Sequence, residues 1–561
     1  MGTFDPLELR QEPIADAFVL PDAPGRSHWN DDVVICGWGQ GNRNVGGGSL
    51  ICRHDLQIVT NETAAFKAFR NRASRANVIV LYEQDAHKKF SLYSTNPVED
   101  PSIHRIVWFR TTLRKLGAAV VQDLASVRAS LEAQGIDIIR LVYADVLGIT
   151  RSKDLLVSEM EHTAKHGPAF CQGVWVTTTR GGVIDDGHGS ISAGLPDMVS
   201  KIDFDTLRPL PWEPGVAFAI ADAYEPDGRE NLASPRMVLK RVLDEYRKLG
   251  LQAIFGPELE FYIARKNASG LFERAINKTG RVYMTGTLVD PEGVFLSMIR
   301  NLGKLGIGTF AGNHEFSPSQ YEINLWHSEA LDAADRTFLM KSAVKELAAR
   351  ANLYATFMGK PWNDEGGSGF HAHISLANLA GENVMYAGEE LSETAKNFLA
   401  GILTHASAMT ALTNPTVNAY KRIRPDSLAP YRINWGYDNR TAMVRIPPDR
   451  GEGTRLEVRV GDGAANPYVV IAAILAAGLD GIKNKLEAPA AAEGWSYQDE
   501  QYQVLPGSLR EALDALESDG FIIDVLGIQF IKTFLALKRD EIERYLAHVS
   551  DWEIAEYLED F

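Results

Sequence analysis

Acidic and imidazole side chains recur at strand-like spacing in three stretches of this sequence. Members of a stretch are two residues apart or flank a short turn signal, and apolar residues stand at most positions between. On a β-strand such residues share one face, and carboxylates with imidazoles on one face suit a divalent metal ion. The residues with this pattern are Glu258, Glu260, Glu315, Glu322, His371 and His373.

A fourth stretch combines both signs of charge. Arg455, Glu457 and Arg459 alternate with aliphatic residues up to Val460, which predicts a half-buried strand. Taken alone, this face also fits a surface ladder of charges, and a lone Glu-x-Glu fits a solvated strand face. Five glutamates with one or two histidines, each on a strand with an apolar reverse side, favour a metal site instead.

Strands and helices that could position these residues are readable in the flanking sequence. Residues 256–261 predict a strand, and 315–322 predict a hairpin around Ser-Pro-Ser. A long amphipathic helix is expected over Leu331–Tyr354, and another begins at Asn466-Pro467 and runs to about Leu486. Nearer the N-terminus, 123–134 reads as a helix.

Composition limits the function classes. The 561 residues suffice for two or more domains, and 45% hydrophobic with 23% charged residues is ordinary for a soluble globular protein. A formal net charge of −16 argues against a nucleic-acid or anionic-membrane partner. Three cysteines without ligand-like spacing and no apolar leader favour a cytoplasmic location. The apolar run Val469–Leu479 is too short to span a bilayer.

From about residue 122 to residue 561 the sequence resembles the glutamine synthetase family. Six ordered motifs carry the resemblance: Gly256–Phe261, His314–Glu322, Gly367–His373, Asn414–Arg422, Asn439–Pro447 and Arg455–Arg459. The resemblance implies an α+β fold with a small β-grasp domain over residues 121–230 and a large catalytic α/β domain over residues 231–561. Residues 1–120 match nothing in the family and are expected to form an extra N-terminal extension.

The resemblance also implies roles for particular residues. Two or three Mg²⁺ or Mn²⁺ ions per site would assist ATP, the first held by Glu260, Glu315 and Glu322 and the second by Glu258, His371 and Glu457. Glutamate would be bound by Arg422 and Arg459, with Gly367 and Leu428 lining the substrate site. ATP would be bound by His373, Ser375, Arg440, Arg445 and Arg455, and Arg422 and Arg440 would act in catalysis.

Two departures from the family pattern concern the amine. Ammonia-using members end an Arg-x-x-Pro-Gly-x-Glu motif with a glutamate that deprotonates ammonium, and Leu428 occupies that position here. A second family carboxylate has no counterpart in Gly173–Thr178, and Asp426, Asp185 and Asp186 are out of register with both acids. A pocket lined by Leu428 and Trp175 would suit a larger, more apolar amine.

The expected function is therefore an ATP-dependent ligase that joins the γ-carboxylate of L-glutamate to an amine, such as aniline or an alkylamine, through γ-glutamyl phosphate. The resemblance is closest in character to γ-glutamylanilide and γ-glutamyl-alkylamide synthetases, which suggests amine catabolism or nitrogen metabolism. An ammonia-using glutamine synthetase and a non-catalytic binding protein are the alternatives. A ring-shaped homo-oligomer of the dodecamer class is also expected from the resemblance.

Overall fold

The computed structural model describes residues 124–185 and 189–561, together with the backbone of six strands nearer the N-terminus. The chain divides into two units, residues 1–122 and 123–561. In the first unit one sheet has the order β3-β2-β1-β4-β5-β6. Its strands are β1 (Val34–Gly39), β2 (Ser49–Arg53), β3 (Gln57–Val59), β4 (Val78–Glu83), β5 (Lys89–Ser94) and β6 (Ala119–Val120). The remainder of the predicted extension over residues 1–120 lies outside the described residues.

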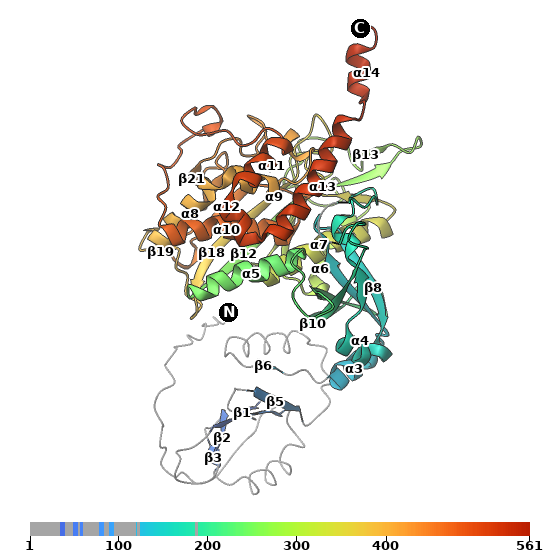
Figure 1. Ribbon diagram of the computed structural model, residues 1–561, viewed down its shortest axis with the longest axis vertical. Helices are drawn as coiled ribbons and strands as arrows, with labels where there is room; N and C mark the ends of the chain where they lie inside the picture. Colours follow the sequence, from blue (N-terminus) through green and yellow to red (C-terminus); the bar gives the residue numbers. More distant parts are fainter. Residues whose placement is uncertain are drawn as a thin grey trace, which may run out of the picture. The chain divides into compact units, whose positions relative to one another are not determined.

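The second unit begins with a small five-stranded sheet in the order β8-β7-β11-β10-β9, in which β7 and β11 are parallel (Figure 1). The side chain of Asp145 shapes the β7–β8 turn, because its Oδ1 accepts hydrogen bonds from the backbone N–H groups of Leu147 (3.0 Å) and Ile149 (2.9 Å). The elements are α3 (Leu124–Ala133), β7 (Ile138–Ala144), β8 (Thr150–Leu156), α4 (Met160–His166), β9 (Ala169–Cys171), β10 (Asp197–Pro209) and β11 (Val216–Tyr224).

A ten-stranded sheet forms the centre of the larger part of the second unit. Its path is β14-β15-β12-β18-β23-β22-β21, and β13, β16 and β17 pair with β12 outside that path. All neighbours except β21 and β22 are antiparallel. The strands are β12 (Leu251–Lys266), β13 (Phe272–Arg274), β14 (Thr309–His314), β15 (Gln320–Leu325), β16 (Ser328–Glu329), β17 (Tyr354–Thr356), β18 (Gly369–Asn378), β21 (Trp435–Tyr437), β22 (Val444–Ile446) and β23 (Leu456–Asp462). With the small sheet and the helices, this confirms the expected α+β fold.

Helix α10 (Pro467–Asn484) is largely buried and packs against α5, α7, α8, α9 and α12. Asn466 caps it by accepting a hydrogen bond from the N–H of Tyr468. By length and composition α10 could cross a membrane, but 78% of it is buried inside the fold, as in the core helix of a soluble protein.

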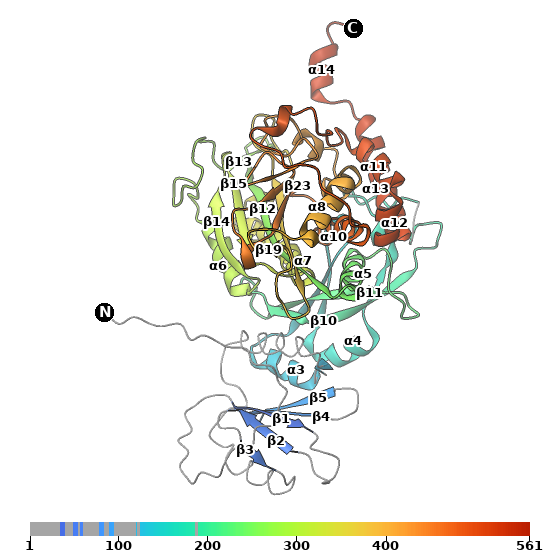
Figure 2. The ribbon, with the colours of Figure 1, turned by 90° about the vertical axis from the view of Figure 1, so that its left-hand side faces the viewer.

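The other main helices are α5 (Pro235–Lys248), α6 (Val294–Leu305), α7 (Ala330–Arg350), α8 (Glu393–Thr404), α9 (Ala406–Thr413), α11 (Leu509–Ser518), α12 (Gly520–Leu526), α13 (Ile528–Leu546) and α14 (Asp551–Tyr557). Two short strands, β19 (Tyr386–Ala387) and β20 (Glu390–Leu391), pair ahead of α8. Both views show α14 extending away from the rest of its unit (Figures 1 and 2).

Three local expectations were wrong. The long helix α7 ends at Arg350 rather than Tyr354, because Asn352 adopts a left-handed φ of 57° and β17 begins at Tyr354. Strand β23 is buried on both faces rather than one, since it lies inside the ten-stranded sheet. Trp175 does not line a substrate pocket in this chain: its side chain is fully buried in the hydrophobic core and contacts Tyr143 edge-on.

The junction between α8 and α9 contains a buried ionic cluster. The His405 ring lies between two carboxylates, with Nδ1 2.6 Å from Asp519 Oδ2 and Nε2 3.1 Å from Asp480 Oδ2. Burial alone would lower the pKa of His405, but the hydrogen bonds with Asp519 and Asp480 outweigh burial and raise it. A protonated His405 therefore stabilises the fold. That contribution is complete below the unfolded pKa of about 6.5 and is lost as pH rises through the raised folded value.

We expect His405→Gln to destabilise the protein by about 1–3 kcal/mol near pH 6, because two partly buried carboxylates lose their cationic partner. The difference from the parent should shrink toward alkaline pH, where His405 is neutral in both states. Thermal unfolding between pH 6 and pH 9 measures it, with His166→Gln on exposed α4 as the control. A difference that grows with pH would contradict the assignment.

Candidate active site

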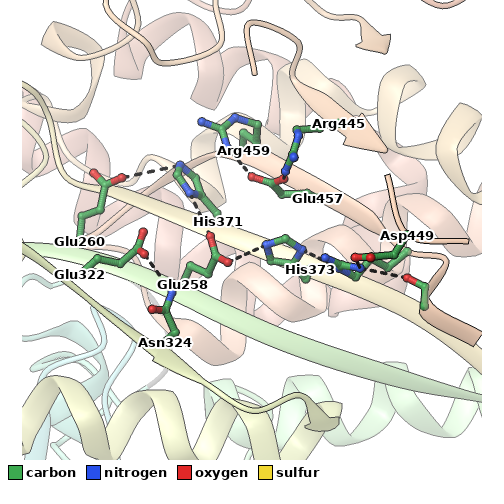
Figure 3. A network of polar contacts seen from close by, with 12 residues as sticks. Glu258, Glu260, Glu322, Asn324, His371, His373, Arg445, Asp449, Glu457 and Arg459 are labelled. Atoms are coloured by element: carbon green, nitrogen blue, oxygen red, sulfur yellow. Dashed lines mark hydrogen bonds and ion pairs between the residues drawn. The ribbon is translucent and has the colours of Figure 1, made fainter. Parts of the chain in front are cut away.

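Most of the glutamates and histidines singled out in the sequence lie on neighbouring strands of the ten-stranded sheet (Figure 3), whereas Glu315 lies just beyond the end of β14 rather than on a strand of the expected hairpin. On β12, Glu258 is directly opposite His371 of β18, and Glu260 is opposite Glu322 of β15. On its other side β18 pairs with β23, which carries Glu457. Because each of these residues is at an alternate position of its strand, their side chains share one face. Sheet pairing thus brings together residues about 200 positions apart in the chain.

Two groups of three side chains have the geometry of a metal site. In each group the possible ligand atoms lie within 4.8 Å of one another: Glu258, His373 and Glu457 form one, and Glu258, Glu322 and His371 form the other. The shared member is Glu258, whose Oε1 is 3.0 Å from His373 Nε2 and whose Oε2 is 3.7 Å from His371 Nδ1. The grouping differs from the family allocation, which places Glu258 in one site only, and the assignment of each ligand stays a prediction.

The two histidines have different surroundings. Arg455 Nε donates a hydrogen bond to His373 Nδ1 (3.1 Å), and Arg455 is itself paired with Asp449 (2.8 Å). A neutral His373 must then carry its proton on Nε2, and this atom is 3.0 Å from Glu258 Oε1 but has no hydrogen-bond partner within the described residues. His371 faces Glu258 on one side and Glu260 at 4.0 Å on the other. The geometry therefore favours His371 as the metal ligand and His373 as a link between Arg455 and Glu258.

Glu260 is held in place by the first residues of β15 and β18. Its Oε2 accepts hydrogen bonds from the backbone N–H of Gly369 (2.8 Å) and from Gln320 Nε2 (3.1 Å). Gln320 also donates to the carbonyl of Gly367 (3.0 Å). These donors leave Oε1 directed toward His371, so they orient the carboxylate from behind.

Two asparagines support the remaining carboxylates and were missed in the sequence analysis. Asn313 donates to Glu315 (2.7 Å) and Asn324 donates to Glu322 (2.9 Å). Each asparagine is two residues from its glutamate: Asn324 and Glu322 share one face of β15, and Asn313 lies in β14 just before Glu315. Asn at i±2 from a metal-type glutamate is the signal that could have identified them.

The carboxylates of this cluster repel one another. Burial first, and then the nearby Glu260 carboxylate, raises the pKa of Glu315 to about 7. Burial and the carboxylates of Glu258 and Glu260 raise the pKa of Glu322 to about 8. The pKa of Glu258 is lowered instead, because its hydrogen bonds with the two histidines outweigh the effect of burial. A carboxylate set with this repulsion, and with oxygen as the main donor, fits hard divalent cations such as Mg²⁺ or Mn²⁺.

Arginines flank the cluster on β22 and β23. The buried carboxylate of Glu457 accepts hydrogen bonds from Arg445 (2.5 Å) and Arg459, and Arg445 also pairs with Asp438 (2.6 Å). Burial would raise the pKa of Glu457, but Arg459 above all lowers it to about 2. The Nε atom of Arg459 is buried and has no hydrogen-bond partner within the described part of the chain. Arg459 thus has one donor free for an anionic ligand.

The other sequence candidates occupy varied positions. Arg422 is buried and donates to the carbonyls of Val460 (3.2 Å) and Arg459 (3.3 Å). Ser375 continues the His371 face of β18 and is half-buried. Arg440 lies exposed between β21 and β22 and shares no hydrogen bond or ion pair with the described residues of the cluster. The family motif that identified Arg440 is its main support.

The structure places the residues that were considered for the amine site. Leu428 is 56% exposed and adopts a left-handed φ of 62° in the turn after Arg422. Asp185 accepts a hydrogen bond from the N–H of Ser192 (2.7 Å), and Asp186 lies outside the described residues. His314, next to Glu315, is a buried core histidine with both ring nitrogens unpaired, and burial lowers its pKa.

Comparisons with known proteins agree with this geometry. Residues 232–557 match the family described as "Glutamine synthetase, catalytic domain". The glutamine synthetase of Pyrococcus abyssi is 38% identical over 439 residues, covering 75% of this chain and 96% of its own, and that of Thermus thermophilus is 36% identical over 451 residues, covering 77% and 98%. Among solved structures, "GmaS/ADP complex" has a TM-score of 0.70 at 33% identity and covers 78% of this chain and all of that one.

A carboxylate-lined sheet face flanked by arginines, on this fold, defines an ATP-dependent carboxylate–amine ligase. The chain belongs to the glutamine synthetase family, whose members use ATP and divalent metal ions. It is therefore an enzyme rather than a non-catalytic relative. The expected ring assembly and cytoplasmic location stay predictions.

Proposed function

We propose that this enzyme joins the γ-carboxylate of L-glutamate to an organic amine rather than to ammonia. The observation that carries the proposal is Leu428, which presents an exposed apolar side chain where ammonia-using members of the family have a glutamate. An ammonium ion needs a negative charge to bind and a base to remove its proton. Leucine supplies neither, and burying an unpaired cation against it is costly. The Gly173–Thr178 segment also has no acid.

Each group of residues in the site has its own role in the proposed reaction. Arg422 and Arg459 hold the carboxylates of glutamate, since guanidinium groups bind carboxylates with two parallel hydrogen bonds. Arg440, Arg445 and Arg455 hold the phosphates of ATP. Bound Mg²⁺ or Mn²⁺, held by Glu258, Glu260, Glu315, Glu322, His371 and Glu457, would neutralise charge on the phosphates. Glutamate's γ-carboxylate takes the γ-phosphoryl group, and the amine then displaces phosphate to give a γ-glutamyl amide.

Leu428→Glu tests this proposal. The parent should use an apolar amine with a higher kcat/KM than ammonium, and the variant should shift the ratio toward ammonium by about 10- to 100-fold. The new carboxylate attracts ammonium and must be desolvated when an apolar group packs on it. Both residues meet the same backbone restraint at this left-handed position, so the comparison isolates the side chain. Phosphate release in the presence of glutamate, ATP and a panel of amines measures the ratio.

A second candidate is an ammonia-using glutamine synthetase, which is favoured by the names of curated relatives at 36–38% identity. The same panel separates the two functions. A parent enzyme that prefers ammonium to every amine tested would support the second candidate and reject the first.

A further inference from the structure

A cavity of about 1250 Å³ lies between the small sheet and the helices α7 and α13. The β7–β8 turn at residues 147–150 and the pair 179–180 line it from the small sheet. Besides α7 and α13, the remaining wall consists of residues 356–358, residues 415–418 and Ala464. None of these lining residues belongs to the candidate active site, so the cavity is a separate place at which a ligand could bind.

The charges that line this cavity are mostly positive, although the protein as a whole has a formal net charge of −16. Its two lining carboxylates already have partners: Glu541 accepts hydrogen bonds from Lys538 (3.0 Å) and from the N–H of Val417 (3.0 Å), and Glu346 pairs with Arg350 (3.0 Å). The basic lining residues are Arg180, Lys341, Lys345, Lys538, Arg544 and His548. The cavity therefore has an excess of positive charge, which attracts anions.

Two lysines on the cavity side of α7 have no carboxylate partner. Lys341 is 7% exposed, and its ammonium group donates a hydrogen bond to the carbonyl of Ala465 (2.7 Å). Lys345 follows one turn later on the same face of the helix, and neither lysine forms an ion pair with a carboxylate among residues 124–185 and 189–561. Burial, and then the charge of Lys345, lowers the pKa of Lys341 to about 7, with Asp462 acting in the opposite direction. A buried ammonium group beside a like charge is costly unless an anion joins it.

The size of the cavity and the type of its cations indicate the ligand. A single phosphate ion would fill only a small part of such a volume, which suits a small organic molecule. Lysine binds phosphate and carboxylate groups as a point charge, and two lysines one turn apart can each bind a separate oxyanion group. The matching ligand is therefore a small molecule that carries at least two such groups.

One wall of the cavity continues directly into a residue assigned to glutamate. Residues 415–418 are separated from Arg422 only by the short turn Ala419–Lys421. Asn418 fixes this wall to a second segment, because its Oδ1 accepts a hydrogen bond from the N–H of Lys360 (2.8 Å) and its Nδ2 donates to the carbonyl of Lys360 (2.9 Å). A ligand that restrains the wall would therefore also restrain the position of Arg422.

We propose that this cavity binds a small molecule with two or more phosphate or carboxylate groups through Lys341 and Lys345, and that the bound molecule is an effector of glutamate binding. The site is separate from the amine, so the inference goes beyond the proposed function and stands for either candidate substrate. Occupancy restrains Arg422 before glutamate arrives, so glutamate binds more tightly. By linkage, glutamate strengthens binding of the anion by the same factor.

Calorimetric titration of the full-length protein with pyrophosphate and, separately, with citrate tests the site in the absence of ATP and metal ions. We expect at least one probe to bind with a Kd below about 1 mM, and comparing the two distinguishes phosphate from carboxylate recognition. In Lys345→Gln that Kd should rise about tenfold, because a charge-assisted hydrogen bond is lost. Lys304→Gln on the exposed side of α6 is the matched control and should bind as the parent does.

Two further variants locate the bound anion. Arg455→Gln should keep the affinity of the parent, whereas an anion held by the arginines assigned to ATP would lose affinity there. Lys341→Met removes the buried charge with little change in side-chain volume, and its Kd should rise by at least the factor seen for Lys345→Gln. Thermal unfolding, measured on each variant, checks that the fold is retained.

Steady-state kinetics test the effector role, at a fixed concentration of free Mg²⁺ and with whichever amine or ammonium the parent prefers. The bound anion should lower the KM for glutamate by about two- to tenfold in the parent and leave it unchanged in Lys345→Gln. Failure of both probes to bind, equal binding to the parent and Lys345→Gln, or loss of binding in Arg455→Gln would each overturn the inference. Binding with an unchanged KM for glutamate would show an adventitious ion only and reject the effector role. A preference for ammonium would reject the proposed function and leave this inference intact.

Discussion

Replacing Glu457 by glutamine is expected to lower the rate of glutamate- and amine-dependent ATP turnover by at least about 100-fold. Glu457 is 1% exposed and is ionised at any working pH, because Arg459 and its neighbours hold its pKa at about 2. The substitution removes a carboxylate from the metal-type group with Glu258. It also leaves the guanidinium groups of Arg445 and Arg459 facing a neutral amide.

The loss of a buried ionic partner has a second measurable consequence. Breaking such a pair typically costs about 3–5 kcal/mol, so unfolding must be measured beside activity. Titration calorimetry with Mn²⁺ separates lost metal binding from lost stability. Glu393→Gln on the surface of α8, with its side chain 84% exposed, is the matched control and should behave as the parent does. A Glu457→Gln enzyme with near-normal turnover at low Mg²⁺ would refute the metal role.

Gly367→Ala should reduce kcat/KM for glutamate by about 100-fold, because small displacements of a substrate-binding group have effects of this size. A Cβ atom at Gly367 would lie 2.7 Å from Cγ and Cδ of Arg422 and 2.7 Å from the carbonyl oxygen of Gly359. The backbone oxygen cannot move easily, so Arg422 must shift. Glycine is required here because a Cβ atom has no room, and not because of the backbone conformation, since Gly367 has no left-handed φ.

The expected kinetic pattern identifies which substrate is affected. The KM for glutamate should rise while the KM for ATP stays within about twofold, because the ATP-side residues Arg445 and Arg455 do not contact Gly367. Gly303→Ala in α6 is the control: its Cβ would meet nothing within 4 Å, and alanine in a helix stabilises by about 0.5–1 kcal/mol. Equal increases in both KM values would indicate a general distortion and contradict the role of Gly367.

Much of the site could be predicted from the sequence because its chemistry is local to each strand. Alternation along β12 and β18 places Glu258 with Glu260, and His371 with His373, on one face whatever the tertiary fold. The motif resemblance then supplied the arginines and the α+β fold class. Helix caps such as Asn466 before α10 were equally readable, since a cap depends only on residues within one turn.

What the sequence by itself determined was therefore the residue types, their faces and the elements that bear them. Only the tertiary structure decided which faces meet. The register of β12 with β15 and β18 makes Glu258 common to both metal-type groups, and the position of Arg455 separates the role of His373 from that of His371. The sequence analysis assigned Trp175 to a pocket, but packing places its side chain in the core. Burial of this kind cannot be predicted from one segment of sequence. The contact between Asp426 and Trp495 joins residues 69 positions apart. No local pattern encodes such a contact, because two loops are brought together only by the packing of the elements that carry them.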